Sequence, residues 1–253
     1  QREARLAAAI EHPNIISVQD AGTTEDGLYY IVMQYVDGEN LHERVARQGQ
    51  HPPKEAARIV LAVTRALARL HGAGLIHRDV KAENVVVSET GAVKLIDFGL
   101  AKDLMEDGAL TIPGAMIGTP IYMAPEIGRV SDVDGRADLY SLGLTYYYLL
   151  TGVPPFEGCD LVDIVRKQAR LTPPETHAPG LPAAHRGVLA RLLAWDRRDR
   201  YATAEALAAD LELLIAGQPT SVAATSASWP GDKEHAEPLK SRPSILKPPY
   251  PDP

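Results

Sequence analysis

The sequence predicts an α+β protein, and two observations carry this prediction. Strand-like runs are short and lie near the start of the chain, whereas segments with helical spacing of apolar side chains dominate the rest. The 253 residues are 45% hydrophobic and 23% charged, which is an ordinary globular composition with enough apolar surface to build a sizeable core.

The composition also excludes several classes of protein. A formal net charge of −7 gives no electrostatic footprint for nucleic acid, so no nucleic-acid partner is expected. The single cysteine, Cys159, cannot form an internal disulfide or a cysteine-based metal site, which indicates a reducing compartment. No uninterrupted apolar run approaches the roughly 20 residues that span a bilayer.

The first third of the chain combines two predicted helices with two predicted strands. An Ala- and Leu-rich helix is expected over 2–11, and strands over 15–20 and 28–35 follow, separated by a Gly/Thr/Asp turn. Asn40 has the side chain of a helix N-cap, which predicts a short helix that runs to about Arg47.

Longer helices follow. Apolar residues fall at helical spacing over 54–71, which predicts an amphipathic helix, whereas 138–151 is apolar nearly all round and predicts a buried one. Between them, 84–88 and 93–96 form a predicted hairpin, and a long loop without periodicity, 98–125, is typical of a functional segment. Three shorter helices are expected over 160–170, 184–195 and 203–216.

Residues 217–253 differ in composition from the rest. Eight of the 36 residues from Gln218 onward are proline, and serine and threonine are frequent. Such a segment buries too little apolar surface to offset its ordering entropy, so a disordered tail or linker is expected.

Three motifs carry the chemistry. Residues 77–84 read HRDVKAEN, 97–99 read DFG and 118–126 read GTPIYMAPE. In this order and spacing they resemble the eukaryotic-type protein kinase family, in its bacterial (Hanks-type) serine/threonine branch. The resemblance covers Arg2 to about Ala216 and implies a protein-kinase-like fold: a mostly helical C-terminal lobe over 37–216 and, over 1–36, a partial N-terminal lobe that lacks its first strands.

The resemblance implies a function for four polar residues. Asp79 takes the catalytic-base position and Lys81 places a positive charge on the transferring phosphate, while Asn84 and Asp97 supply the hard oxygen ligands that Mg²⁺ (or Mn²⁺) prefers. ATP is the implied phosphoryl donor, and protein Ser/Thr hydroxyls are the acceptors. The alternative, that Asp79 and Asp97 are ordinary turn acids, is disfavoured by Lys81 and Asn84 in register.

Further residues take supporting positions by the same resemblance. Arg78 would pair with a phosphorylated Thr111, although Thr111 is equally readable as an unmodified loop residue. Thr119 resembles the threonine that bonds the catalytic Asp and Lys, and so serves substrate docking. Three residues resemble structural supports, namely Glu126 and Arg200 as a buried ion pair and Asp138 as an acceptor for the catalytic loop.

Nucleotide binding has weaker signals. Residues 30–36 resemble the strand that leads into the adenine-binding hinge, with Met33 as gatekeeper and with Gln34 and Val36 supplying backbone groups. Val86 resembles the floor of the adenine pocket. Apolar strand residues such as these are equally often plain core.

The front of the chain departs from the family pattern. Glu3 takes the place of the helix glutamate that pairs with a strand lysine, but no G-x-G-x-x-G loop and no V-A-I-K pattern occur anywhere in the sequence. We therefore expect an N-terminally truncated kinase domain, with weak nucleotide affinity and little turnover as it stands.

Two other functions remain open from sequence. A pseudokinase scaffold would keep the fold without catalysis, but has no need for Asp79, Lys81, Asn84 and Asp97 together. A kinase-like small-molecule phosphotransferase fits poorly with the peptide-docking pattern at 118–126. A cytoplasmic location is expected, and membrane attachment only if a transmembrane helix lies beyond residue 253.

Overall fold

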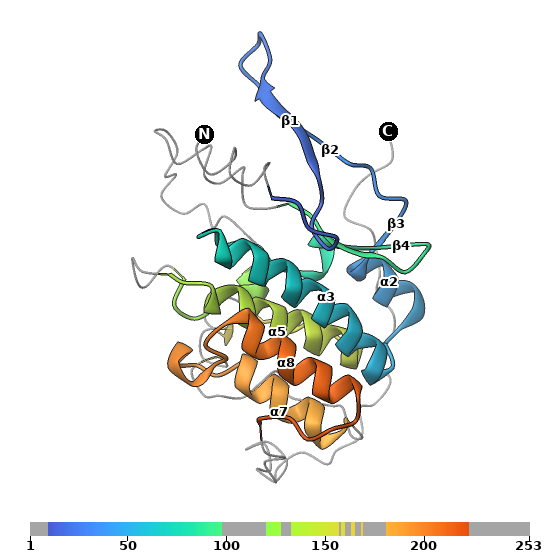
Figure 1. Ribbon diagram of the computed structural model, residues 1–253, viewed down its shortest axis with the longest axis vertical. Helices are drawn as coiled ribbons and strands as arrows, with labels where there is room; N and C mark the ends of the chain where they lie inside the picture. Colours follow the sequence, from blue (N-terminus) through green and yellow to red (C-terminus); the bar gives the residue numbers. More distant parts are fainter. Residues whose placement is uncertain are drawn as a thin grey trace.

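The computed structural model describes residues 10–97, 120–127, 133–156, 158–159, 163–164, 168 and 181–222. Two small antiparallel sheets lie at one end of a body of packed helices (Figure 1). This arrangement confirms the predicted α+β class. The described helices are α2 (Leu41–Gln48), α3 (Pro53–Gly72), α5 (Arg136–Thr151), α7 (Ala183–Leu192) and α8 (Ala204–Ile215).

The first sheet is a hairpin of β1 (Val18–Thr23) and β2 (Tyr29–Met33), which projects from the helical body in Figure 1. Strand β1 begins three residues later than the sequence predicts. The cause is that Ile16 donates its N–H to the Leu95 carbonyl at 3.0 Å, so this stretch joins the second sheet region instead of the hairpin. Ile15 and Ile16 are each only 2% exposed, so their apolar side chains mark the core and not a strand face.

The second sheet has the order β3 (Gly38–Asn40), β4 (Val85–Ser88) and β5 (Val93–Leu95). The β4–β5 hairpin agrees with the sequence prediction, whereas β3 was not predicted because three residues carry no readable alternation. Gly38 explains how β3 approaches β4. A Cβ at this position would clash with the carbonyl oxygen of Val87, so only glycine permits the pairing.

Local sequence signals start α2 and shape α3. Asn40 Oδ1 accepts the Glu43 N–H at 2.9 Å, and Glu43 Oε2 accepts the Asn40 N–H at 3.0 Å, which is a complete capping box. Helix α3 has proline at its first position, where a missing N–H costs nothing. Its apolar face is buried against α5 and α8, as the spacing predicts.

Helix α5 forms the centre of the core, and residues 137–150 are all buried. Its buried hydroxyl groups find partners both inside and outside the helix, since Thr145 donates to the Ser141 carbonyl at 3.1 Å and Ser141 lies 2.7 Å from the Tyr122 carbonyl. Helix α7 packs closely on α5 at Gly143, where an added Cβ would lie 2.8 Å from Leu192 Cβ. Helix α8 lies alongside α3 (Figure 1).

Parts of the sequence predictions fall outside the described residues. Most of 2–11 and of 160–170 lies there, as does the tail from residue 223. At the start of the predicted tail, Ser221 donates from both its N–H and its hydroxyl to Asp210, each at 2.7 Å. The division into a domain over 1–216 and a tail over 217–253 stays a prediction. Within the described ranges, no helix has the length and apolarity needed to cross a membrane.

Candidate active site

The loop between α3 and β4 brings three polar side chains together. Lys81 Nζ lies 2.9 Å from Asp79 Oδ2, and Asn84 Nδ2 donates to the same oxygen at 2.9 Å. The Asp79 and Lys81 side chains are each 18% exposed. The Asp79 carboxylate is therefore held between a cation and an amide and still accessible to a substrate.

Asp97 lies beside this cluster because the backbone connects the two segments. The N–H of Ile96 donates to the Asn84 carbonyl at 2.8 Å, and Asp97 is the next residue. Asp97 is exposed and has a φ of 57°, in the left-handed region that disfavours side chains. The chain therefore turns away from strand β5 at Asp97, directly after Ile96, whose N–H bonds to the Asn84 carbonyl.

The donor set at this point fits a divalent metal ion. The Asn84 amide uses its nitrogen on Asp79, which leaves its oxygen for another partner, and Asp97 adds a carboxylate. Oxygen ligands of this kind suit Mg²⁺, which keeps several waters and binds phosphates. Among the described residues no group of three His, Cys, Asp or Glu side chains could hold a metal.

Asp138, in helix α5, anchors the loop that carries the Asp79 cluster. Its carboxylate accepts the backbone N–H groups of His77 and Arg78, each at 2.8 Å, and Oδ2 also lies 2.8 Å from His71 Nε2. Asp138 is 1% exposed, and its contacts offset the cost of burying a carboxylate. Arg78 has a φ of 63°, so this anchoring also fixes an unfavourable backbone conformation.

His77 and His71 are two site residues to which the sequence assigned no role. The Nδ1 atom of His77 accepts the Asp79 N–H at 3.3 Å and Nε2 lies 3.3 Å from the Ile96 carbonyl, so the imidazole links both halves of the cluster. Burial lowers the pKa of His77 against the opposing effect of Asp138, which keeps the ring neutral. A function for His77 could have been inferred from its position within the HRDVKAEN motif. No sequence pattern indicates a function for His71, because its partner Asp138 lies 67 residues away in the chain.

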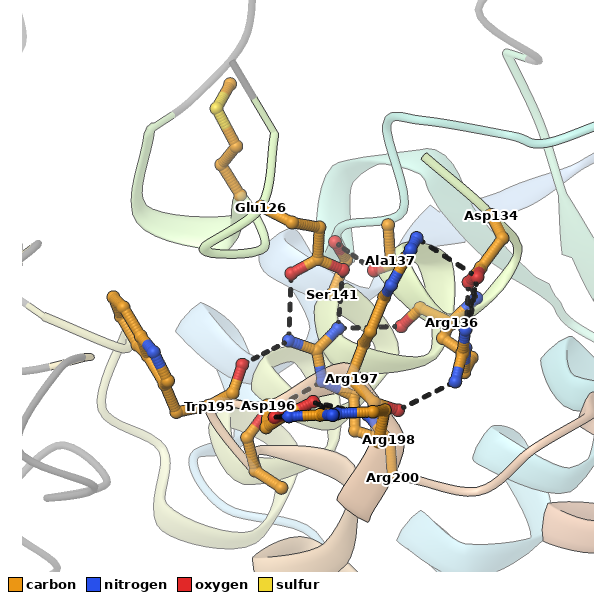
Figure 2. Close-up of polar contacts among 12 residues, drawn as sticks. Glu126, Asp134, Arg136, Ala137, Ser141, Trp195, Asp196, Arg197, Arg198 and Arg200 are labelled. Carbon is orange, nitrogen blue, oxygen red and sulfur yellow. Dashed lines mark hydrogen bonds and ion pairs between the residues drawn. The ribbon is translucent and has the colours of Figure 1, made fainter. Parts of the chain in front are cut away.

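Glu126 and Arg200 form an ion pair in which the guanidinium is fully buried (Figure 2). The carboxylate accepts from Arg200 Nη1 at 2.7 Å and from Nη2 at 2.9 Å. The remaining guanidinium N–H groups donate to the carbonyls of Ala194, Trp195 and Arg136. All five donors of Arg200 are thus used, as a fully buried guanidinium requires.

The residues expected at the nucleotide pocket lie on or near the two sheets. Met33 is 40% exposed at the end of β2, and the Gln34 N–H donates to the Ser17 carbonyl at 2.9 Å. Val36 packs partly against the core. Val86 lies between buried Val85 and Val87 in β4 and is itself half-buried, on the opposite sheet face.

Three of the predicted site residues, Glu3, Thr111 and Thr119, lie outside the described residues. Arg78, the predicted partner of Thr111, is exposed.

The fold and the loop geometry define a protein kinase domain, and comparison with known families agrees. The protein kinase domain model matches residues 1–211. The chain belongs to this family.

Within this family, the chain is similar to curated serine/threonine-protein kinases of bacteria. The chain is 42% identical over 224 residues to serine/threonine-protein kinase PknB of Mycobacterium leprae, covering 87% of this chain and 36% of the relative. Over 225 residues it is 41% identical to PknB of Mycobacterium tuberculosis (strain H37Rv), with the same coverage. It is 44% identical over 224 residues to serine/threonine-protein kinase pkn3 of Myxococcus xanthus, covering 84% of this chain and 41% of the relative. The chain thus spans well under half the length of these relatives.

Proposed function

We propose that the chain is the catalytic domain, over 1–216, of a serine/threonine protein kinase that uses ATP and a divalent metal ion. The observation that carries this proposal is the Asp79–Lys81–Asn84 cluster, which the Ile96–Asn84 backbone bond joins to Asp97. Similarity to the bacterial serine/threonine kinases supports Ser and Thr hydroxyls of proteins as acceptors.

The reaction follows from the positions of Asp79 and Lys81. Asp79 accepts the proton of the substrate hydroxyl as its oxygen attacks the γ-phosphorus of ATP. The bond from the γ-phosphorus to the bridging oxygen breaks, and ADP leaves. Lys81 lies beside Asp79 and stabilises the negative charge on the transferring group.

Asn84 and Asp97 would hold Mg²⁺, the ion we propose. When bound, Mg²⁺ supplies charge neutralisation at the phosphates. The hinge segment with Met33, Gln34 and Val36 would contact adenine from one side and Val86 from the other, and Glu3 would belong to the same nucleotide site.

The remaining roles are also proposals. Arg78 would bind a phosphorylated Thr111, and Thr119 would support substrate docking. Asp138 and the Glu126–Arg200 pair would keep the loops in place, a role that their hydrogen bonds support. The single cysteine supports a cytoplasmic location.

The test is transfer of labelled γ-phosphate from ATP to a protein acceptor, made with the longest gene product that contains this chain. Asp79→Asn should lower the rate by at least about 10²-fold, because it removes the proton acceptor and the ion pair with Lys81, and should leave nucleotide binding unchanged, because the residues proposed to contact adenine lie on other segments. Asp26→Asn, the same change in the exposed β1–β2 turn, should have no effect. Equal rates for the two variants, or labelling of small alcohols but not of protein Ser and Thr, would reject the proposal.

A further inference from the structure

A row of basic side chains runs along the exposed face of α3. The spacings of four, seven and four residues place its members within an arc of about 60°, since each residue advances the helix by about 100°. The row extends about 22 Å at roughly 1.5 Å per residue. All four of its members are exposed, and we call them the α3 basic face: Lys54, Arg58, Arg65 and Arg69.

Little negative charge from the described residues compensates this face. Arg65 bonds to Glu212 of α8 at 2.9 Å, in a pair of which both side chains are more than half exposed. No ion pair joins Lys54, Arg58 or Arg69 to any described acid. The positive charge is therefore concentrated on one helix of a chain whose net charge is −7.

The one acid within α3 is used elsewhere. Glu55 bonds Arg44 at 3.2 Å and lies 3.3 Å from His51, in a cluster with α2. Glu55 therefore forms its ion pair with α2 and does not neutralise the side chains of the α3 basic face.

His12 lies close enough to one end of this face for its charges to act on the imidazole. Its pKa is lowered first by burial and then by the charges of Arg69, Lys94 and Arg65. Lys94 belongs to β5 and donates to the Ile15 carbonyl at 3.2 Å, so it adds positive charge from a different element. The field at this corner therefore comes from several fixed cations.

We propose that the α3 basic face binds an acidic peptide segment of a partner protein. An extended peptide advances about 3.3 Å per residue, so about seven residues match the 22 Å row. Complementary charge along such a row favours encounter and fixes orientation. The proposal does not depend on phosphoryl transfer.

The shape and surroundings of the face favour a peptide over two other anionic partners. Acidic side chains of α8 border the face on one side, since Glu212 bonds Arg65 and Glu205 lines a hollow together with His71 and Gly72 of α3. A flat anionic membrane or a wide duplex would also approach these acids. In the described part of the chain, α3 carries no Phe, Tyr or Trp for base stacking, and the exposed large apolar side chains lie on other elements.

The test measures binding of a fluorescein-labelled octaglutamate peptide to the whole chain by fluorescence anisotropy at low salt. Arg58→Glu and Arg69→Glu should each weaken binding by about threefold to tenfold, since each reversal replaces an exposed attraction by a repulsion. Arg186→Glu is the matched control: it makes the same charge change on the exposed side of α7, and should leave the affinity unchanged. Added salt should weaken binding to the wild type.

A second readout covers the case in which a charge reversal impairs folding. Bound octaglutamate should raise the pKa of His12 in an NMR titration, and Arg69→Gln should reduce the affinity without reversing a charge. Equal affinities for Arg58→Glu, Arg69→Glu and Arg186→Glu, or equal binding of octaglutamine, would overturn the proposal. Tighter binding of duplex DNA or anionic vesicles that depends on the same arginines would overturn the assignment to a peptide.

Discussion

Asn84 is bonded to Asp79 at two points, with its side-chain nitrogen 2.8 Å from the Asp79 carbonyl oxygen and 2.9 Å from the carboxylate Oδ2. A proposed metal ligand and the proposed proton acceptor are therefore one rigid unit. Any change in the orientation of the amide also changes the orientation of the carboxylate.

Replacement of Asn84 tests this coupling. Asn84→Ala should lower kcat for phosphoryl transfer by at least about 10²-fold, because it removes a metal ligand and releases Asp79. Asn84→Asp keeps an oxygen ligand but loses the amide donor and places a second carboxylate beside Asp79. This variant should retain saturation by Mg²⁺ and still show a low kcat. Thr90→Ala, on the exposed β4–β5 turn, should match the wild type, and an Asn84→Asp rate equal to it would contradict the coupling.

Arg200 is expected to dominate the stability of the C-terminal half. Arg200→Ala leaves Glu126 without its partner and should lower the free energy of unfolding by about 3–5 kcal/mol, measured by urea denaturation. Arg198→Ala removes a fully exposed arginine that bonds to Asp196 and should leave the urea midpoint unchanged. Similar midpoints for these two variants would show that the buried pair is dispensable.

Two glycines in helices should respond oppositely to the same substitution. At Gly143 an added methyl group would meet Leu192 Cβ at 2.8 Å and Leu193 Cδ2 at 2.9 Å, so Gly143→Ala should cost about 1–3 kcal/mol of stability. At Gly72, the last residue of α3, nothing lies within 4 Å of the added carbon. Gly72→Ala should leave the Tm unchanged or raise it slightly. Thermal unfolding followed by circular dichroism checks both, and an unchanged Tm for Gly143→Ala would contradict close α5–α7 packing.

His185 should make the protein less stable in mild acid. It is 7% exposed, its Nδ1 atom is hydrogen-bonded to the Tyr146 hydroxyl, and burial lowers its pKa. As the pH falls through about 6.5, the unfolded chain therefore binds a proton at this histidine, whereas the folded protein binds it only at a lower pH. The free energy of unfolding should be highest above pH 6.5 and decrease as the pH falls below it.

His185→Gln tests the origin of this slope. The variant should weaken the dependence of the urea midpoint on pH between about pH 7 and 5, because one of the titrating groups is gone. Buried His77, whose pKa is also lowered, keeps the slope from vanishing. An identical slope in the wild type and the variant would assign the whole effect to other groups.

The sequence predicted those elements whose signals are local. The Asn40 cap, the apolar spacing of α3 and the all-apolar α5 each depend on residues within a few turns of one another, and all three helices are found. The start of β1 was misplaced because the apolar side chains of Ile15 and Ile16 serve the core and not a strand. Apolar character alone does not distinguish a residue of an irregular core segment from a residue of a strand.

The same distinction applies to the site. Asp79, Lys81 and Asn84 lie within six residues of one another, so their spacing predicts their proximity. The contacts of His71 with Asp138 and of His77 with Ile96 depend on how distant segments pack. These contacts follow from tertiary structure and have no counterpart in local patterns.

Arg78 and Asp97, which flank the catalytic cluster, both adopt the left-handed backbone conformation that glycine enters at little cost. At these two positions the backbone preference of the chain conflicts with the functions proposed for the side chains. A selection for thermal stability alone would favour glycine there, whereas a selection for the proposed functions would retain Arg78 as the partner of a phosphorylated Thr111 and Asp97 as a metal ligand. Stability-driven redesign of this domain would therefore put function at risk at two of the three described non-glycine residues that have a positive φ, the third being Phe156.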